Sequence, residues 1–256
     1  MTATLEVHDL VKRFGGVDAL AGIGFDLDEG EFTAMIGPNG AGKSTCFNVI
    51  DGQLRPDGGT VRLDGRDVSR ADARRMNRLG VGRTFQVAAA FASLSVADNL
   101  RAAIIARENR ARQVWPRAHR LYREEVDGLL SRVGLTDAAA RQAALLAYGD
   151  IKRLELAIAL AGRPRVLLMD EPTAGMAPAE RRQLMELVRS IAGEEGLTVL
   201  FTEHDMDVVF DHAARIIVLD RGRILADGTP AEVRRNAKVR ESYLGSGFGG
   251  GDAEPE

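Results

Sequence analysis

Residues 37–45 read Gly37-Pro38-Asn39-Gly40-Ala41-Gly42-Lys43-Ser44-Thr45. The spacing Gly-x-x-x-x-Gly-Lys-[Ser/Thr] is typical of a phosphate-binding loop when a strand precedes it and a helix follows it. Residues 31–36 form a short, largely apolar run that predicts the strand, and residues 43–50 predict the start of a helix. We therefore predict that residues 37–45 bind a nucleotide.

The loop offers a suitable group for each part of a magnesium nucleotide. Gly37, Gly40 and Gly42 allow the backbone to turn tightly and present its amides to phosphate oxygens at a helix N-terminus. We expect Lys43 to contact β- and γ-phosphate oxygens and Ser44 to ligate Mg²⁺. The alternative is a glycine-rich turn without a ligand. It would require this motif to occur by chance between a predicted strand and a predicted helix.

Bulk composition limits the possible function classes. The 256 residues are enough for one large or two small domains with a substantial core. A net charge of −3 gives no electrostatic footprint for nucleic acid, so we expect no nucleic-acid partner. The lone Cys46 rules out an internal disulfide and fits a reducing compartment. We find no leader and no run approaching 18 apolar residues, so any membrane role is expected to come through partners.

The amino-terminal region predicts an antiparallel pair of strands. Residues 5–10 and 23–27 alternate between apolar and polar positions. Phe14 is expected in the connection between them, where an exposed ring could stack on a nucleotide base. From the residues alone, packing against neighbouring side chains is the more common role of a loop phenylalanine.

A helical region is expected to interrupt the α/β core. The apolar spacing of residues 86–134 is mainly helical, and we expect a helical subdomain at about residues 87–162. Its arginine-rich middle, residues 107–123, fits a solvated helix pair better than a docking surface because glutamates dilute the charge. The whole domain is expected to span residues 1–245, followed by a disordered, glycine- and acid-rich tail at residues 246–256.

Parallel α/β construction is predicted after the helical region. Residues 166–169 form a continuous apolar strand that delivers Asp170 and Glu171 at its carboxyl end. A helical segment and a second buried strand follow, and the latter ends at Glu203-His204. Because ligands bind at the carboxyl ends of strands in such sheets, these side chains should meet the phosphate loop.

The residues at this edge match the needs of nucleotide hydrolysis. Adjacent carboxylates are costly to bury without a cation, so we assign Asp170 to the Mg²⁺ shell and Glu171 to the general base. His204 could reach a γ-phosphate or the attacking water. Gln86 could contact Mg²⁺ or water. His204 and Gln86 are therefore further catalytic candidates.

Taken in order, these motifs resemble the ATP-binding cassette of ABC transporters over residues 5–245. The resemblance implies a P-loop NTPase core of ABC type, with an antiparallel β subdomain and an inserted helical subdomain, that uses ATP and Mg²⁺. It assigns Phe14 to base stacking. The matching elements are Phe14, the Walker A loop 37–45, Gln86 of the Q-loop, the signature Leu146-Ala147-Tyr148-Gly149-Asp150, the Walker B pair Asp170-Glu171 and the switch residue His204.

Within this family the chain is similar to cassettes of the branched-chain amino acid importers. The similarity rests on Arg83-Thr84-Phe85-Gln86, residues 146–149, residues 203–206 and the ending Tyr243-Leu244-Gly245. It implies an ATP-hydrolysing subunit that powers uptake of branched-chain or related amino acids. The expected partners are a second ABC ATPase subunit, identical or different, integral-membrane permeases and, indirectly, a solute-binding protein. The expected location is peripheral, on the cytoplasmic face of the cell membrane.

The resemblance also implies that each ATP lies between one chain's loop 37–45 and the other chain's signature. The family's usual signature is Leu-Ser-Gly-Gly-Gln, so the serine hydroxyl is missing at Ala147. The Gly149 amide could still contact an anion. We expect Asp150 to act as the N-cap of a helix beginning at Ile151 rather than as a catalytic group.

A second departure follows the acidic pair. Ala177 stands where the family usually has an aspartate that bridges the two subunits. Because alanine cannot form that bridge, we expect weaker self-association and pairing with a different cassette subunit. Alternatives to amino-acid import are a lipopolysaccharide-export or a urea or amide transporter cassette. A soluble ABC ATPase without a membrane partner is the alternative from a different class.

Overall fold

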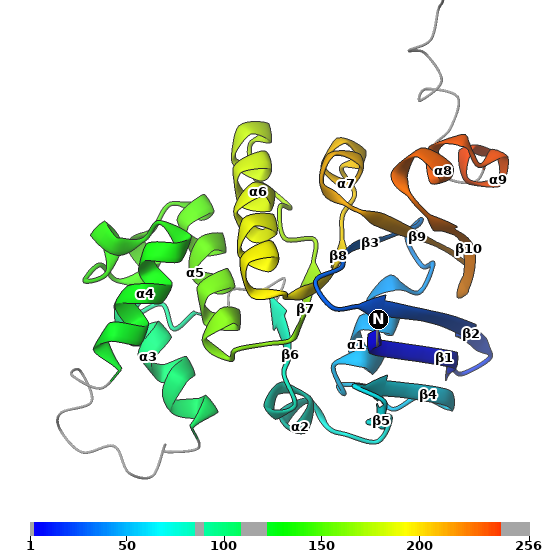
Figure 1. Ribbon diagram of the computed structural model, residues 1–256, viewed down its shortest axis with the longest axis horizontal. Helices are drawn as coiled ribbons and strands as arrows, with labels where there is room; N and C mark the ends of the chain where they lie inside the picture. Colours follow the sequence, from blue (N-terminus) through cyan, green and yellow to red (C-terminus); the bar gives the residue numbers. More distant parts are fainter. Residues whose placement is uncertain (1–2, 85–89, 109–121, 242–256) are drawn as a thin grey trace, which may run out of the picture.

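The computed structural model describes residues 3–84, 90–108 and 122–241. Their strands form a four-stranded sheet of order β2-β1-β4-β5 and a six-stranded sheet of order β10-β9-β3-β8-β7-β6. Figure 1 shows the two sheets on either side of α1 (Lys43–Ile50). The fold is α/β, as the sequence predicts.

The smaller sheet is antiparallel and longer than the alternating sequence predicts. Its long hairpin consists of β1 (Ala3–Phe14) and β2 (Val17–Asp28), and β4 (Gly58–Leu63) and β5 (Arg66–Asp67) extend it on the other side of β1. Phe14 is therefore the last residue of β1, paired with Val17, and the prediction that it lies in the connection is wrong. The register shifts near Asp9, which has a φ of 46°. This bulge interrupts the alternation of apolar and polar residues. The alternation therefore predicts a strand that ends at residue 10, whereas β1 continues to Phe14.

The larger sheet is parallel except at one edge. Only β10 runs antiparallel to its neighbour, β9, within this sheet. Every residue of β3, β7 and β8 is buried, as expected for strands covered on both faces. The strands are β3 (Phe32–Ile36), β6 (Val81–Thr84), β7 (Val166–Asp170), β8 (Thr198–Thr202), β9 (Arg215–Asp220) and β10 (Arg223–Gly228).

Helix α1 is the link between the sheets. Its Cys46, Phe47 and Ile50 are fully buried in a core cluster that includes side chains of both sheets, such as Leu5 of β1 and Leu168 of β7. Such burial at consecutive turns is what an amphipathic helix between two apolar surfaces requires. The phosphate-loop candidate, which directly precedes α1, is thus supported by the core of the molecule.

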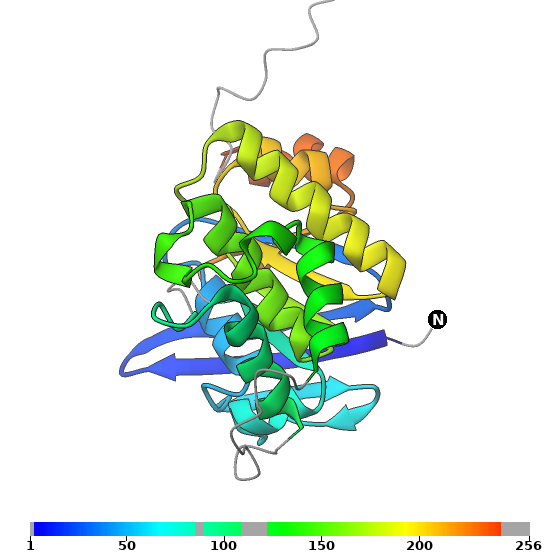
Figure 2. The same cartoon turned by 90° about the vertical axis from the view of Figure 1, so that its left-hand side faces the viewer.

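Three helices gather beyond β6 in the region predicted to form the helical subdomain. They are α3 (Val96–Arg107), α4 (Arg123–Val133) and α5 (Tyr148–Ala161), which contact one another. Figure 2 shows them side by side in front of the larger sheet. Ser95 caps α3 through a hydrogen bond from the Asp98 amide, and Gly134 ends α4 in the left-handed conformation.

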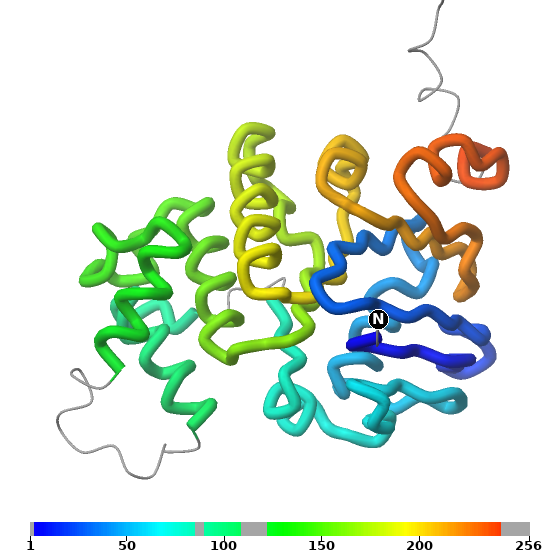
Figure 3. Tube along the Cα trace, in the orientation of Figure 1, coloured from blue at the N-terminus to red at the C-terminus, as the bar shows by residue number. Residues whose placement is uncertain are grey.

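The remaining helices cover the larger sheet and its carboxyl-terminal edge, and Figure 3 traces the chain through them. They are α2 (Ala73–Arg78), α6 (Pro178–Glu195), α7 (Met206–His212), α8 (Pro230–Arg235) and α9 (Ala237–Val239), with 3₁₀ turns at Thr136–Ala138 and Ala143–Leu145. Within the described ranges, none of the helices has both the length and the apolar composition needed to cross a membrane. The predicted tail, most of the arginine-rich segment and Gln86 lie outside the described residues.

Candidate functional site

The loop between β3 and α1 has a backbone that only glycine tolerates. Gly37 and Gly42 have φ values of 152° and 108°. A Cβ added to Gly37 would lie 2.2 Å from the Leu219 carbonyl oxygen, and one added to Gly42 would lie 2.5 Å from the Ala19 carbonyl oxygen. Both contacts are with backbone, which cannot move aside cheaply. The glycines therefore set a tight loop whose amides precede the N-terminus of α1.

Lys43 begins α1 and turns back into the loop. Its Nζ donates hydrogen bonds to the carbonyl oxygens of Gly37 at 2.6 Å and Pro38 at 3.2 Å. Burial lowers the pKa of Lys43, while the charges of Glu171 and Asp170 oppose that shift. The structure thus brings this lysine into the electrostatic range of both predicted acidic residues.

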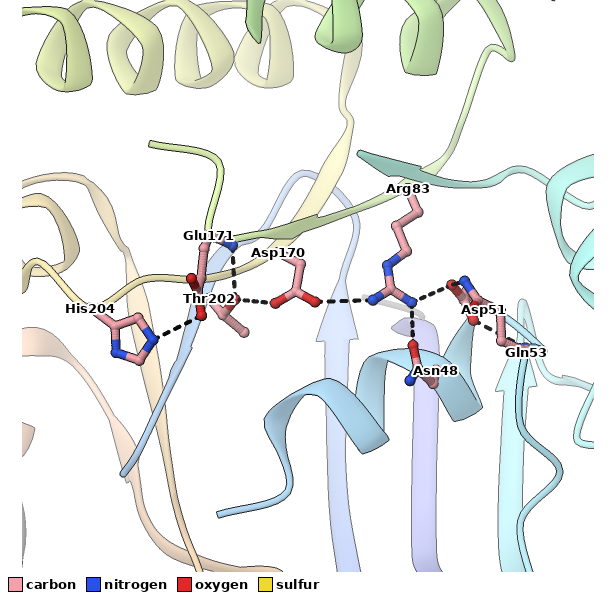
Figure 4. Close-up of polar contacts among 8 residues, drawn as sticks. All are labelled: Asn48, Asp51, Gln53, Arg83, Asp170, Glu171, Thr202 and His204. Atoms are coloured by element: carbon pink, nitrogen blue, oxygen red, sulfur yellow. Dashed lines mark hydrogen bonds and ion pairs between the residues drawn. The ribbon is translucent and has the colours of Figure 1, made fainter. Parts of the chain in front are cut away.

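Asp170 ends β7 with both carboxylate oxygens bonded. Thr202 Oγ1 donates to Oδ1 at 2.8 Å, and Arg83 Nη2 donates to Oδ2 at 3.0 Å (Figure 4). The cation beside Asp170 in the structure is the guanidinium of Arg83 of β6, a residue that the sequence pattern did not place at the site. An arginine inside a short strand next to a fully buried one is the signal that could have indicated it.

Glu171 lies just beyond β7 and meets the predicted histidine. Glu171 Oε1 is 2.8 Å from His204 Nε2 (Figure 4). An ionised carboxylate only accepts hydrogen bonds, so this contact requires the proton on Nε2. Glu171 has a φ of 49°, an uncommon conformation for a residue with a side chain. Its amide nitrogen donates to Thr202 Oγ1 at 3.1 Å, which fixes the turn.

Glu203 is a further buried residue whose role the sequence did not indicate. Its side chain is 3% exposed, and Oε1 accepts hydrogen bonds from the Thr173 amide at 2.8 Å and the Thr173 hydroxyl at 2.7 Å. Burial raises the pKa of this carboxyl group. Glu203 thus ties the loop after β7 to the loop after β8, which carry Glu171 and His204.

The signature residues lie at the start of α5, not in the phosphate loop. The helix begins at Tyr148 with Ala147 as its N-cap, so the prediction that Asp150 caps a helix from Ile151 is wrong. Ala147 adopts extended backbone angles without a side-chain cap, which no sequence preference reveals. Asp150 falls in the first helical turn, where a negative charge is favourable. The Tyr148 hydroxyl donates to the Ala174 carbonyl at 2.9 Å, which joins the signature to the loop after β7.

Phe14 lies apart from these contacts. Phe14 is 48% exposed at the end of β1, and the Lys12 ammonium lies 5.6 Å from its ring centroid. An exposed ring is free to stack on another flat group. Gln86 lies outside the described residues.

The oxygen atoms of Ser44 and Asp170 suit a Mg²⁺ ion that is bound together with a nucleotide, and not a metal ion whose ligands all come from the protein. In the described part of the chain, no three His, Cys, Asp or Glu residues are grouped to hold a metal ion. Mg²⁺ usually takes one or two protein oxygens and completes its shell with phosphates and water. The hydroxyl of Ser44, within the loop 37–45, and the Asp170 carboxylate are donors of that kind.

Comparisons with known proteins agree with this geometry. The profile of the family described as "ABC transporter" matches residues 20–174, and that of the "Branched-chain amino acid ATP-binding cassette transporter" matches residues 223–249.

Similar whole chains carry related names. The chain is 40% identical to the high-affinity branched-chain amino acid transport ATP-binding protein BraF of Pseudomonas aeruginosa, over 94% of this chain and 97% of that protein. It is 39% identical to LivG of Salmonella typhimurium, described as a high-affinity branched-chain amino acid transport ATP-binding protein, with the same coverage. The crystal structure of the ADP conformation of MJ1267, an ATP-binding cassette of an ABC transporter, superposes with a TM-score of 0.83 at 29% identity, covering 96% of this chain and all of that one (100%).

Proposed function

This chain belongs to the ABC transporter ATP-binding family, and on that premise we propose that it powers the uptake of branched-chain or related amino acids. The observation that carries the proposed chemistry is the contact of Glu171 with His204 beside Lys43 and Asp170. The substrate class is supported by the names of the similar proteins and by the match at residues 223–249.

The residues at the strand ends divide the work of ATP hydrolysis. Lys43 and the loop amides bind phosphate oxygens. Glu171 accepts a proton from the attacking water while His204 holds the Glu171 carboxylate in place. The water oxygen bonds to the γ-phosphorus, the bond to the bridging oxygen breaks, and ADP and phosphate leave. Ser44 and Asp170, with Gln86 as predicted, would hold Mg²⁺, which when bound neutralises phosphate charge.

A second cassette subunit completes each site in this proposal. Residues 146–150 of one chain would contact the nucleotide in the other chain's loop, and Phe14 would stack on the base. Ala177 is the N-cap of α6, and its methyl side chain has no atom that could hydrogen-bond to a partner. We therefore favour pairing with a different cassette. Mass measurement of the purified complex would test this, because two identical copies would contradict it.

The helical region provides the route to the membrane. We propose one ABC ATPase domain at residues 1–245, with residues 87–162 as the helical subdomain that contacts integral-membrane permeases. The domain would lie on the cytoplasmic face of the membrane, with a solute-binding protein on the other side. The names of the similar proteins, together with the description of the family matched at residues 223–249, favour this role over lipopolysaccharide export, urea or amide transport and a soluble ATPase.

Uptake by the reconstituted transporter tests the proposed function. The affinity-tagged chain should copurify with permease subunits, and liposomes containing that complex should accumulate labelled leucine when ATP and the solute-binding protein are supplied. A matched complex carrying Glu171→Gln should assemble but not transport. Failure to copurify any membrane protein, or accumulation of an unrelated solute only, would overturn the proposal.

A further inference from the structure

Arg83 bridges the acidic end of β7 and the far end of α1. Its Nη2 donates to Asp170 Oδ2 at 3.0 Å, and its Nη1 donates to Asn48 Oδ1 and to Asp51 Oδ2, each at 2.6 Å. Figure 4 shows the guanidinium between these groups. The contacts join residues separated by 35, 32 and 87 positions in the chain.

We propose that Arg83 is a positioning residue that orients the Asp170 carboxylate for Mg²⁺ bound with the nucleotide. The inference rests on the proposed ATPase function and adds a residue to its site. Arg83 would not contact the metal or the nucleotide. It would act through Asp170.

The charged groups of the bridge are buried. The side chains of Arg83, Asp51 and Asp170 are only 11%, 8% and 7% exposed. Water therefore does little to screen these charges, and an unpaired member would be costly. One guanidinium between two carboxylates lowers that cost and ties the three groups to one geometry.

The far end of the bridge is itself anchored. Asp51 accepts hydrogen bonds from Gln53 at both carboxylate oxygens, Oδ2 from the side-chain amide at 2.8 Å and Oδ1 from the backbone amide at 3.1 Å. Asn48 lies within α1, and Asp51 is the C-cap of this helix. The same helix begins at Lys43 and carries Ser44. Arg83 thus connects the helix of one proposed Mg²⁺ ligand to the strand of the other.

Among the residues that the structure describes, two hydrogen bonds at the near end leave Asp170 with further acceptor capacity. Arg83 occupies one lone pair of Oδ2, and Thr202 Oγ1 occupies one of Oδ1 at 2.8 Å. Each carboxylate oxygen has a second lone pair that can accept a metal-bound water or the metal itself. Two donors on opposite oxygens prevent the carboxylate from rotating, which fixes the direction of the free lone pairs.

The geometry requires arginine and not simply a positive charge. A planar guanidinium can reach Asp51 with one terminal nitrogen and Asp170 with the other, whereas a lysine ammonium is a single point. Arg83→Lys therefore keeps the charge and removes one end of the bridge. An effect of this variant on metal binding would report orientation and not charge.

The test measures metal binding by the purified full-length protein. ATP affinity is titrated without divalent ions and then as a function of Mg²⁺, and Mn²⁺ bound with ATP is followed by electron paramagnetic resonance. Arg83→Lys should leave the metal-free ATP affinity within about twofold and raise the Mg²⁺ concentration for half-maximal effect by about tenfold, the scale of lost support for a metal ligand. The Mn²⁺ spectrum should broaden or change its splitting.

Arg107→Lys is the matched control. Arg107 also bridges two carboxylates, Glu108 and Glu125, but it does so in the helical region. The Arg107→Lys variant should leave the Mg²⁺ dependence of ATP binding unchanged. If Arg83→Lys does not fold, Asp51→Asn and Asn48→Ala loosen the far end of the bridge and should shift the Mg²⁺ dependence in the same direction.

The outcomes separate this inference from the proposed function. Wild-type protein that binds no ATP would contradict the ATPase itself. Wild-type protein with normal Mg²⁺-dependent binding, together with a folded Arg83→Lys that shows the same Mg²⁺ dependence and Mn²⁺ spectrum, would overturn the positioning role and leave the ATPase intact.

Discussion

At the scale of single residues, Lys43 is the proposed phosphate ligand of the loop before α1. Its ammonium group is held by the carbonyl oxygens of Gly37 and Pro38 and lies in the field of two carboxylates. Burial lowers its pKa, but the acidic neighbours favour the charged form. A phosphate that replaces the carbonyl contacts would offer the ammonium a fully charged partner.

Lys43→Ala should therefore weaken ATP binding. Loss of a charged hydrogen-bond donor costs about 1.5–3 kcal/mol, which corresponds to roughly a 10- to 150-fold higher dissociation constant. Titration with a fluorescent ATP analogue would measure this change, with the exposed Lys238→Ala as control. Equal affinity of the Lys43 variant and the wild type would contradict the role of the loop.

Other residues at the site differ in how far local sequence could predict them. Asp170, Glu171 and His204 each end a recognisable run, so their convergence followed from the rule for parallel sheets. The place of Arg83 at the site could not be predicted in this way, because its hydrogen-bond partners are distant in the chain and no local pattern relates them to it. Asp150 was misplaced because the helix begins at a residue whose side chain gives no capping signal.

At the scale of elements, the loop before α1 depends on its packing against neighbouring backbone. Gly42 has a φ of 108° and lies close to the Ala19 carbonyl and to Leu20 of β2. The antiparallel sheet therefore shapes the phosphate loop directly. The spacing of the glycines predicted the loop, but the long-range contact that makes Gly42 necessary is visible only in the structure.

Gly42→Ala should destabilise the loop and lower nucleotide affinity. The strained φ alone costs about 1–3 kcal/mol, and the clash with the Ala19 carbonyl adds to it. Urea unfolding and ATP titration would measure the two effects. Gly16→Ala is the control, because its added Cβ meets nothing within 4 Å and its φ lies outside the left-handed region. Unchanged stability and affinity of Gly42→Ala would argue against the tight loop.

At the scale of the whole molecule, the proposed site and the three helices α3, α4 and α5 occupy different parts of the fold. The sheets and α1 hold the loop, the acidic pair and His204, while α3, α4 and α5 lie together on the far side of β6 (Figure 1). The sequence predicted that the loop, the acidic pair and His204 converge, because the parallel strands β3, β7 and β8 that carry them end at the same edge of the sheet. The bulge in β1 and the length of the hairpin were not predictable, since pairing continued where the alternation failed.

Steady-state ATP hydrolysis by the Glu171→Gln protein, compared with the wild type in the same purified transporter, tests the central claim most directly. Removing the proton acceptor should lower turnover by about 100-fold or more, while ATP binding and the fold are retained. Glutamine keeps the size of the side chain and one acceptor oxygen that can face His204, but it has no basic carboxylate to take the proton. Hydrolysis at the wild-type rate would contradict the account of how this site splits ATP.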